Sequence, residues 1–339
     1  MDSTKLYTNV KVGKPVNAVI EITGEVPADI LEFHRKEVLE KVKKQIEIPG
    51  FRKGNVPEAL VLKQVNMNHV LEDAAEEALN AAYPLILDEH KIVPVSSPRI
   101  TLVKLAQNAP LEFKVDIAVE PTVTLPNYKK IASAIKAKKA PIEVTDKEVD
   151  EVIEQLRTMR AGEDGKPAEL TDEFVKTLGH FENVADFNAK LKDNVKAEKE
   201  TEGQRIRYEE LAQGLVADAK VTIAPLQIED EMYAAHGRLH RELEKRKMSA
   251  EEYFKIIKKT EEEYMKEKKE AIERQLKTKF ILKAIAEKEG IKADEKAVEK
   301  ELAHAAAHYP NTDAESFRNY IEEMMANEQT LKFLEEANW

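Results

Sequence analysis

Residues 48–57 read Ile-Pro-Gly-Phe-Arg-Lys-Gly-Asn-Val-Pro and separate two segments in which apolar residues recur at helical spacing. Gly50 and Gly54 permit backbone angles that other residues avoid. Pro57 sets the angle at which the next helix begins, because proline is pre-organised for a first helical turn. The stretch therefore predicts a loop between two helices, and the elements on either side decide the fold around it.

The centre of this loop places an aromatic ring beside two cations. Phe51 offers apolar area, while Arg52 and Lys53 suit phosphate or carboxylate groups. The combination predicts a docking tip on an exposed loop. An ordinary turn between helices, with Phe51 half-buried, is the alternative.

On the N-terminal side of the loop, the apolar pattern changes its period. Residues 6–12 are rich in β-forming residues, residues 13–15 form a turn, and residues 16–23 alternate apolar with polar, so a hairpin is predicted. From Pro27 the period becomes helical. The expected apolar face of this helix comprises Leu31, Val38, Val42 and Ile46.

After the loop, helices are predicted from Pro57 and from about residue 68 to residue 89, followed by strands within 92–105 and 111–119. The order strand, strand, helices, strand, strand predicts an α+β domain over residues 1–121. Its antiparallel sheet should carry the helices on one side.

The helix before the loop is basic although the chain is acidic. Residues 34–53 hold seven Lys or Arg against three Glu, a local charge of +4, whereas the whole chain carries −11. A basic end on an acidic body can approach RNA or an acidic protein. A solvated helix face with a lysine excess is the alternative.

Residues 48–57, in this position between strands and helices, resemble the signature of trigger factor, the bacterial ribosome-associated chaperone. In that family the Phe-Arg-Lys tip docks on a ribosomal protein beside the exit tunnel. The resemblance implies that Gly50, Phe51, Arg52, Lys53, Gly54 and Pro57 form a ribosome-binding site. The α+β region matches the family's ribosome-binding domain over its whole length.

Composition excludes several other classes of protein. A net charge of −11 argues against a general nucleic-acid binder, and 35% charged with 6% aromatic residues favours long solvated helices. The absence of cysteine excludes disulfides and thiolate chemistry and fits a reducing compartment. No signal-peptide core or apolar run of membrane-spanning length is present, so we expect a cytoplasmic protein without a membrane partner.

Beyond Pro121 the composition changes again. Residues 122–144 contain prolines and lysines with little periodicity and are predicted to be a linker. Residues 145–339 are predicted to be a mostly α-helical domain. Its helix starts carry three capping boxes, Thr145 with Glu148, Ser249 with Glu252 and Thr260 with Glu263. The resemblance implies that this domain forms extended helical arms that hold nascent chains.

The segment at about residues 161–169 departs from the family pattern. Most trigger factors carry a peptidyl-prolyl isomerase domain between the two helices that flank it. Such a domain needs roughly 100 residues to bury a core, and about nine residues bridge this gap. We therefore expect the isomerase domain to be absent and the chain not to be an enzyme.

Side chains that could carry chemistry give no catalytic pattern. His236 with His240, and His304 with His308, share a helix face as metal ligands can, but surface histidines are the favoured interpretation. We expect no catalytic residue, cofactor or metal. Five methionines offer adaptable apolar contacts for clients, with helix core as the alternative; they are Met232, Met248, Met265, Met324 and Met325.

These observations predict an ATP-independent chaperone that docks at the ribosomal exit tunnel and shields nascent polypeptides. Its expected partners are the ribosome, through protein and RNA near the tunnel, and unfolded or nascent chains. The resemblance also implies a homodimer away from the ribosome. A ribosome-independent holdase or assembly scaffold of the same fold is the alternative.

Overall fold

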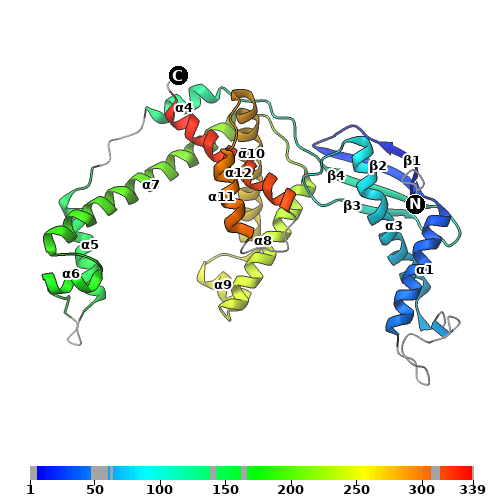
Figure 1. Ribbon diagram of the computed structural model, residues 1–339, viewed down its shortest axis with the longest axis horizontal. Helices are drawn as coiled ribbons and strands as arrows, with labels where there is room; N and C mark the ends of the chain where they lie inside the picture. The colour runs from blue at the N-terminus through cyan, green and yellow to red at the C-terminus, as the bar shows by residue number, and fades with distance from the viewer. Residues whose placement is uncertain are drawn as a thin grey trace. The chain divides into compact units, whose positions relative to one another are not determined.

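A computed structural model describes residues 6–46, 60–61, 64–137, 143–161, 166–306 and 314–337 (Figure 1). The chain forms two compact units. One combines residues 1–124 with 221–280, and the other combines residues 125–220 with 281–339. The predicted domain boundaries at 121/122 and 144/145 follow the order of the chain and stay a prediction.

The first unit contains the predicted antiparallel sheet. Its strands are β1 (Thr8–Val12), β2 (Val19–Val26), β3 (Arg99–Lys104) and β4 (Leu111–Ala118), in the spatial order β1-β2-β4-β3. In the register of the two central strands, Ile20 faces Ile117 and Ile22 faces Val115. All four of these side chains are buried, as the alternating pattern predicts.

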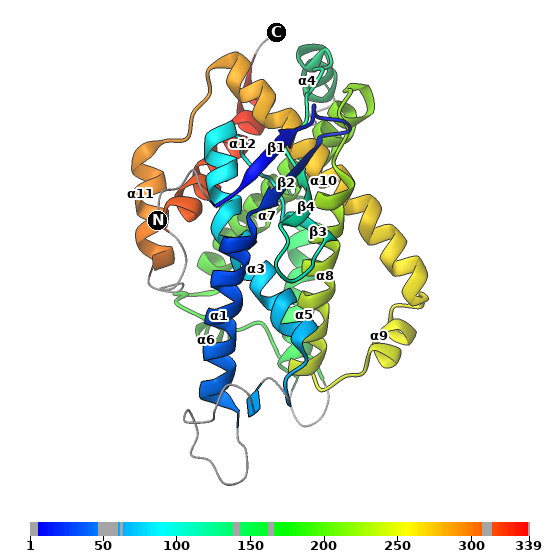
Figure 2. The same ribbon diagram turned by 90° about the vertical axis from the view of Figure 1, so that its right-hand side faces the viewer.

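Two long helices cover the apolar face of this sheet. They are α1 (Ala28–Gln45) and α3 (Met67–His90), which lie side by side in Figures 1 and 2. Both contribute to one core with β2 and β4. Four alanines of α3 are buried there, and their small side chains let the helix approach α1 and the sheet closely.

The opposite face of the central strands is polar. Lys114 of β4 lies 2.6 Å from a carboxylate oxygen of Glu21 and 3.4 Å from one of Asp116. A sheet with one apolar and one charged face needs only one covering layer. This arrangement confirms the predicted α+β fold with helices on one side.

The first unit also contains α8 (Pro225–Lys245), α9 (Ala250–Ile256) and the first part of α10 (Glu261–Glu289). Pro225 lies in the first turn of α8, where proline lacks no hydrogen bond that the helix needs. Ser97 N–H donates to Asp230 at 2.7 Å, and Arg99 pairs with Glu229, so α8 is tied to the start of β3. Ile228, Ile272 and Phe280 bury a second core between α8 and α10.

The second unit begins with a helix that the sequence analysis did not predict, α4 (Tyr128–Lys136). Asn127 caps it by accepting from the N–H of Lys130, and Tyr128 donates to Glu289 at 2.6 Å. The helix packs against α7 (Val184–Asp218) and α12 (Ala314–Glu336). A short lysine-rich helix of this kind depends on such contacts, which no local pattern reveals.

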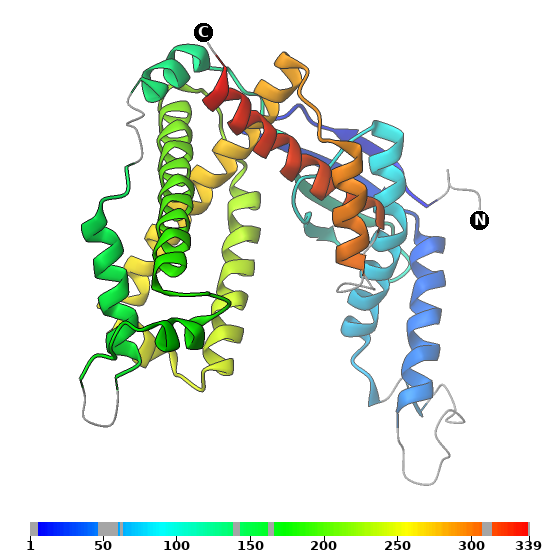
Figure 3. The same cartoon turned by 60° about the vertical axis from the view of Figure 1, so that its left-hand side comes forward.

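Helices α5 (Asp146–Met159), α6 (Asp172–Leu178) and the start of α7 bury a separate small core. It contains Val149, Ile153, Val175 and Phe187. Helix α7 is continuous over Val184–Asp218, which the apolar pattern left open between one helix and two. Helix α11 (Glu295–Ala306) pairs with α12 at the end of the chain (Figure 3).

All three predicted capping boxes form. In the first, Thr145 accepts from the N–H of Glu148 at 3.4 Å, and Glu148 accepts from the N–H of Thr145 at 2.9 Å. The same reciprocal bonds join Ser249 with Glu252 and Thr260 with Glu263. Gly290 follows α10 with φ 71°, as expected of a glycine at a helix end.

We expect the carboxyl group of Glu148, in the first capping box, to titrate at an unusually low pH. A hydrogen bond from Lys199, at 2.6 Å, together with the Thr145 bonds lowers the pKa of Glu148 from 4.5 to about 2. Because the folded pKa is depressed, the contribution to helix stability is complete above pH 4.5 and is lost as pH falls through about 2. Carboxyl NMR should give that midpoint, and Lys199→Ala should raise it. A midpoint near 4.5 in both proteins would contradict this assignment.

Candidate functional site

The candidate tip falls in the sequence between the ends of α1 and α3 that are remote from the sheet. Helix α1 starts directly after β2, and the end of α3 is held at β1, where Tyr7 donates to Glu89 at 2.5 Å. The opposite ends, at Gln45 and Met67, are therefore about 27 Å from the sheet, since α1 has 18 residues. Figure 1 shows both helices running in this direction.

The predicted site residues themselves, Gly50, Phe51, Arg52, Lys53, Gly54 and Pro57, lie outside the described residues. The described chain reaches Ile46, whose φ of −67° and ψ of 137° are extended, so the helix ends there. It resumes at Leu60. The last described residue before the loop is thus the C-cap of α1, and the described chain after the loop leads into α3, so a packed helix pair flanks the loop on both sides in the sequence.

The electrostatics near the tip are more balanced than the sequence of α1 suggests. Lys41 pairs with Glu77 of α3 at 2.6 Å, and Lys43 pairs with Glu40 at 3.3 Å. Lys44, in the last turn, is exposed. Because α3 supplies carboxylates, part of the predicted positive charge is neutralised within the helix pair.

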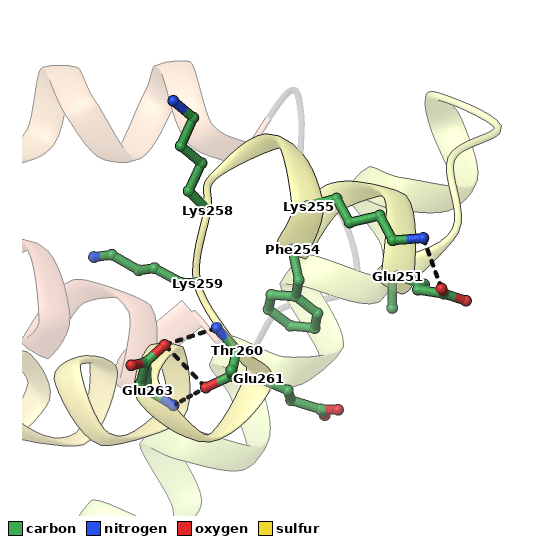
Figure 4. A pocket seen from close by; sticks show the side chains of 9 residues that line it. Glu251, Phe254, Lys255, Lys258, Lys259, Thr260, Glu261 and Glu263 are labelled. Carbon is green, nitrogen blue, oxygen red and sulfur yellow. Dashed lines mark hydrogen bonds and ion pairs between the residues drawn. The ribbon is translucent and has the colours of Figure 1, made fainter.

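A second candidate surface lies at the junction of α9 and α10, which Figure 4 shows from close by. An open pocket of about 530 Å³ is lined by one aromatic ring, that of Phe254, and by charged side chains that include Lys255, Lys258 and Lys259. The ring of Phe254 packs at 5.5 Å from Tyr253 and 5.6 Å from Tyr264. The sequence analysis did not predict this cluster. The signal available was three aromatic residues, Tyr253, Phe254 and Tyr264, within a highly charged stretch of twelve residues.

Other exposed apolar side chains occur on the helices. Tyr233 of α8 is 85% exposed, Met159 of α5 is 72% exposed and Ile256 of α9 is 64% exposed. Among the five methionines named from the sequence, Met324 is exposed, whereas Met232 packs against the core of α8 and α10. The methionines are therefore divided between the two interpretations.

Of the two predicted histidine pairs, the structure describes both members of only one, His236 with His240. His236 and His240 lie on α8 with their rings 5.1 Å apart, as expected of an i, i+4 pair. His308 lies outside the described residues. No third donor joins the α8 pair in the part of the chain that the structure describes.

Two family models match the chain. The bacterial trigger factor protein model matches residues 8–156, and the model of the trigger factor C-terminus matches residues 183–336. The chain belongs to the trigger factor family.

Curated trigger factors align along nearly the whole chain. That of Carboxydothermus hydrogenoformans is 26% identical, over 94% of this chain and 96% of its own length. The trigger factor of Clostridium beijerinckii is 25% identical, over 96% of this chain and 99% of its own length. A solved structure titled "Promiscuous Substrate Recognition in Folding and Assembly Activities of the Trigger Factor Chaperone" has a TM-score of 0.53. At 18% identity it covers 97% of this chain and 99% of its own, and it supports the fold.

The same alignments indicate what this trigger factor lacks. The first spans 414 positions, 75 more than the 339 residues of this chain, so at least 75 positions hold residues of the relative alone. The two family matches leave only residues 157–182 between them. Those 26 residues include α6 and are too few for an isomerase domain of roughly 100 residues. The chain lacks that domain region, as predicted.

No described helix is long and apolar enough to cross a membrane.

Proposed function

We propose that this protein is an ATP-independent chaperone that docks on translating ribosomes through Phe51, Arg52 and Lys53 and shelters emerging polypeptides. The observation that supports this function best is the pairing of both family matches with an intact Gly-Phe-Arg-Lys-Gly loop. Gly50, Gly54 and Pro57 would shape the loop, and the α1–α3 pair would carry it away from the sheet.

Docking would use two kinds of contact. Phe51 would bury its ring in an apolar depression of a ribosomal protein near the exit tunnel, as aromatic anchors do at interfaces. Arg52 and Lys53 would contact RNA phosphates or acidic side chains, which makes binding sensitive to salt. The chain's net charge of −11 would oppose wider contact with RNA and so confine binding to the tip.

Client binding would rest on the exposed apolar side chains of the helices. An unfolded segment held at such a surface is removed from encounters with other unfolded chains and is released as it folds. The pocket beside Phe254 suits this role because an apolar ring lies among charged side chains of both signs, which can contact the polar flanking residues of a client. Weak, reversible contact of this kind needs no cofactor.

Phe254→Ala should weaken the complex with an unfolded client about fivefold, which corresponds to ~1 kcal/mol of lost aromatic contact. The measurement is Kd for a permanently unfolded protein in free solution, without ribosomes. Phe33→Ala is the matched control, because Phe33 on α1 is 41% exposed and lies outside the pocket. Equal losses in both variants would argue against a specific role for the pocket.

The proposal does not include peptidyl-prolyl isomerisation, because the domain that carries this activity in the family is missing. A proline-limited peptide assay should give the uncatalysed rate in the presence of the protein. We also propose a cytoplasmic location and a homodimer in the absence of ribosomes. Sedimentation at increasing protein concentration tests the dimer.

Co-sedimentation of the purified protein with ribosomes tests the proposed function as a whole. Binding that decreases with salt is expected. Absence of binding, with suppression of aggregation retained, would favour the alternative of a ribosome-independent holdase or assembly scaffold.

A further inference from the structure

A cluster of one histidine and two carboxylates joins α1 to α3, apart from both surfaces described above. His34 and Glu37 stand three residues apart on α1, and Glu77 approaches from α3. The Nδ1 atom of His34 lies 3.3 Å from Oε2 of Glu37 and 3.9 Å from Oε2 of Glu77. One donor atom from each residue lies within 4.8 Å of the other two.

These separations suit a small metal ion. Zn²⁺ binds imidazole nitrogen and carboxylate oxygen at about 2.0–2.2 Å, so tetrahedral ligands stand ~3.4 Å from one another. The separations from His34 are 3.3 and 3.9 Å, and all three donor atoms lie within 4.8 Å of one another, so side-chain adjustments of about 1 Å would meet that geometry. We propose that His34, Glu37 and Glu77 bind one divalent transition-metal ion, of the Zn²⁺ or Co²⁺ type, with a fourth position open to water.

The state of His34 supports this assignment. Its side chain is only 12% exposed, and Nδ1 makes no hydrogen bond in the part of the chain that the structure describes. A buried polar atom without a hydrogen-bond partner is costly, and a metal ion would satisfy it. A mixed imidazole and carboxylate set favours zinc-like ions over magnesium or calcium, which take oxygen alone.

The third ligand is held by a contact of its own. Lys41 donates to Oε1 of Glu77 at 2.6 Å, which leaves Oε2 facing His34. Such a partner orients a metal ligand. The ammonium also repels the ion, so Lys41 both positions Glu77 and limits the affinity.

The chain contains a natural comparison. His69 lies 3.2 Å from Glu72 on α3, with the same i, i+3 spacing, but the two side chains are 72% and 57% exposed. Among the described residues no third donor completes a group around them. A two-ligand exposed pair should bind an ion much more weakly than the three-ligand cluster.

The test is titration of the full chain with Zn²⁺ by calorimetry, and with Co²⁺ by visible absorption. We expect Glu37→Gln and His34→Gln to weaken binding at least tenfold, and His69→Gln and His236→Gln to leave it unchanged. Glu37 is 46% exposed, so Glu37→Gln should fold normally even if a change at His34 does not. Zn²⁺ should also slow amide exchange in α1 and α3 of the wild type but not of Glu37→Gln.

Two results would overturn the proposal. One is the absence of binding up to millimolar Zn²⁺, which would leave the cluster as a contact between His34 and two carboxylates without a metal. The other is binding that survives Glu37→Gln but is lost with His69→Gln or His236→Gln.

Discussion

Replacement of Phe51, Arg52 and Lys53 together by alanine should weaken ribosome binding about 100-fold, or ~3 kcal/mol, and so abolish co-sedimentation. The variant removes the aromatic ring and both cations and leaves Gly50, Gly54 and Pro57 unchanged. The helix pair that carries the loop has its own core, so far-UV circular dichroism should not change.

A matched control separates the tip from general loss of charge. Phe254→Ala with Lys255→Ala and Lys258→Ala also removes one phenylalanine and two lysines or arginines, at the α9–α10 pocket. This control should co-sediment with ribosomes like the wild type but bind the unfolded client more weakly. The tip variant should lose co-sedimentation and keep its client affinity. Co-sedimentation of the tip variant with ribosomes would refute the docking site. If neither variant co-sedimented, ribosome binding would not be specific to the tip.

Phe113→Ala should destabilise the sheet of the first unit by about 3–5 kcal/mol. Phe113 is 1% exposed on the central strand β4 and faces Gly24 of β2 in the register. A Cβ added at Gly24 would lie 2.8 Å from the Phe113 ring, so the ring occupies the space that glycine leaves open. Alanine at position 113 would leave a cavity that the rigid strand pair cannot close.

Because the chain has two compact units, a single unfolding midpoint would mix their stabilities. Amide exchange of β2 and β4, followed by mass spectrometry in native buffer, isolates the affected unit. Exchange there should accelerate by roughly two to four orders of magnitude. Phe33→Ala, at a 41% exposed position, should change it little. Similar small effects of both substitutions would contradict the assigned role of Phe113.

Local sequence signals were sufficient for several elements. The alternation around Ile20 and Val115 predicted the central strands, since burial of one face of a sheet enforces a period of two. The capping boxes at Thr145 and Ser249 formed as predicted, because both partners lie three residues apart. The sequence of residues 48–57, together with its place between strands and helices, was sufficient to indicate the family, and the two family matches confirm it.

Other features depend on residues far apart in the chain. Helix α4 was missed in a segment predicted to be a linker, because its buried residues Tyr128 and Ala132 belong to a helix that packs against α7 and α12, far along the chain. Continuity of α7 was likewise not evident from its many charged residues. In both cases tertiary packing outweighs weak helix propensity.

The sequence by itself determined the family, the central strands, the starts of the capped helices, the candidate docking motif and the loss of the isomerase region. These follow from neighbouring residues or from chain length. Only the tertiary structure decided that Glu77 meets His34, that Lys41 is neutralised across the helix pair, and that Phe254 joins Tyr264 at a pocket. Those contacts join separate elements, and their geometry depends on how the helices pack, which spacing along one helix does not specify.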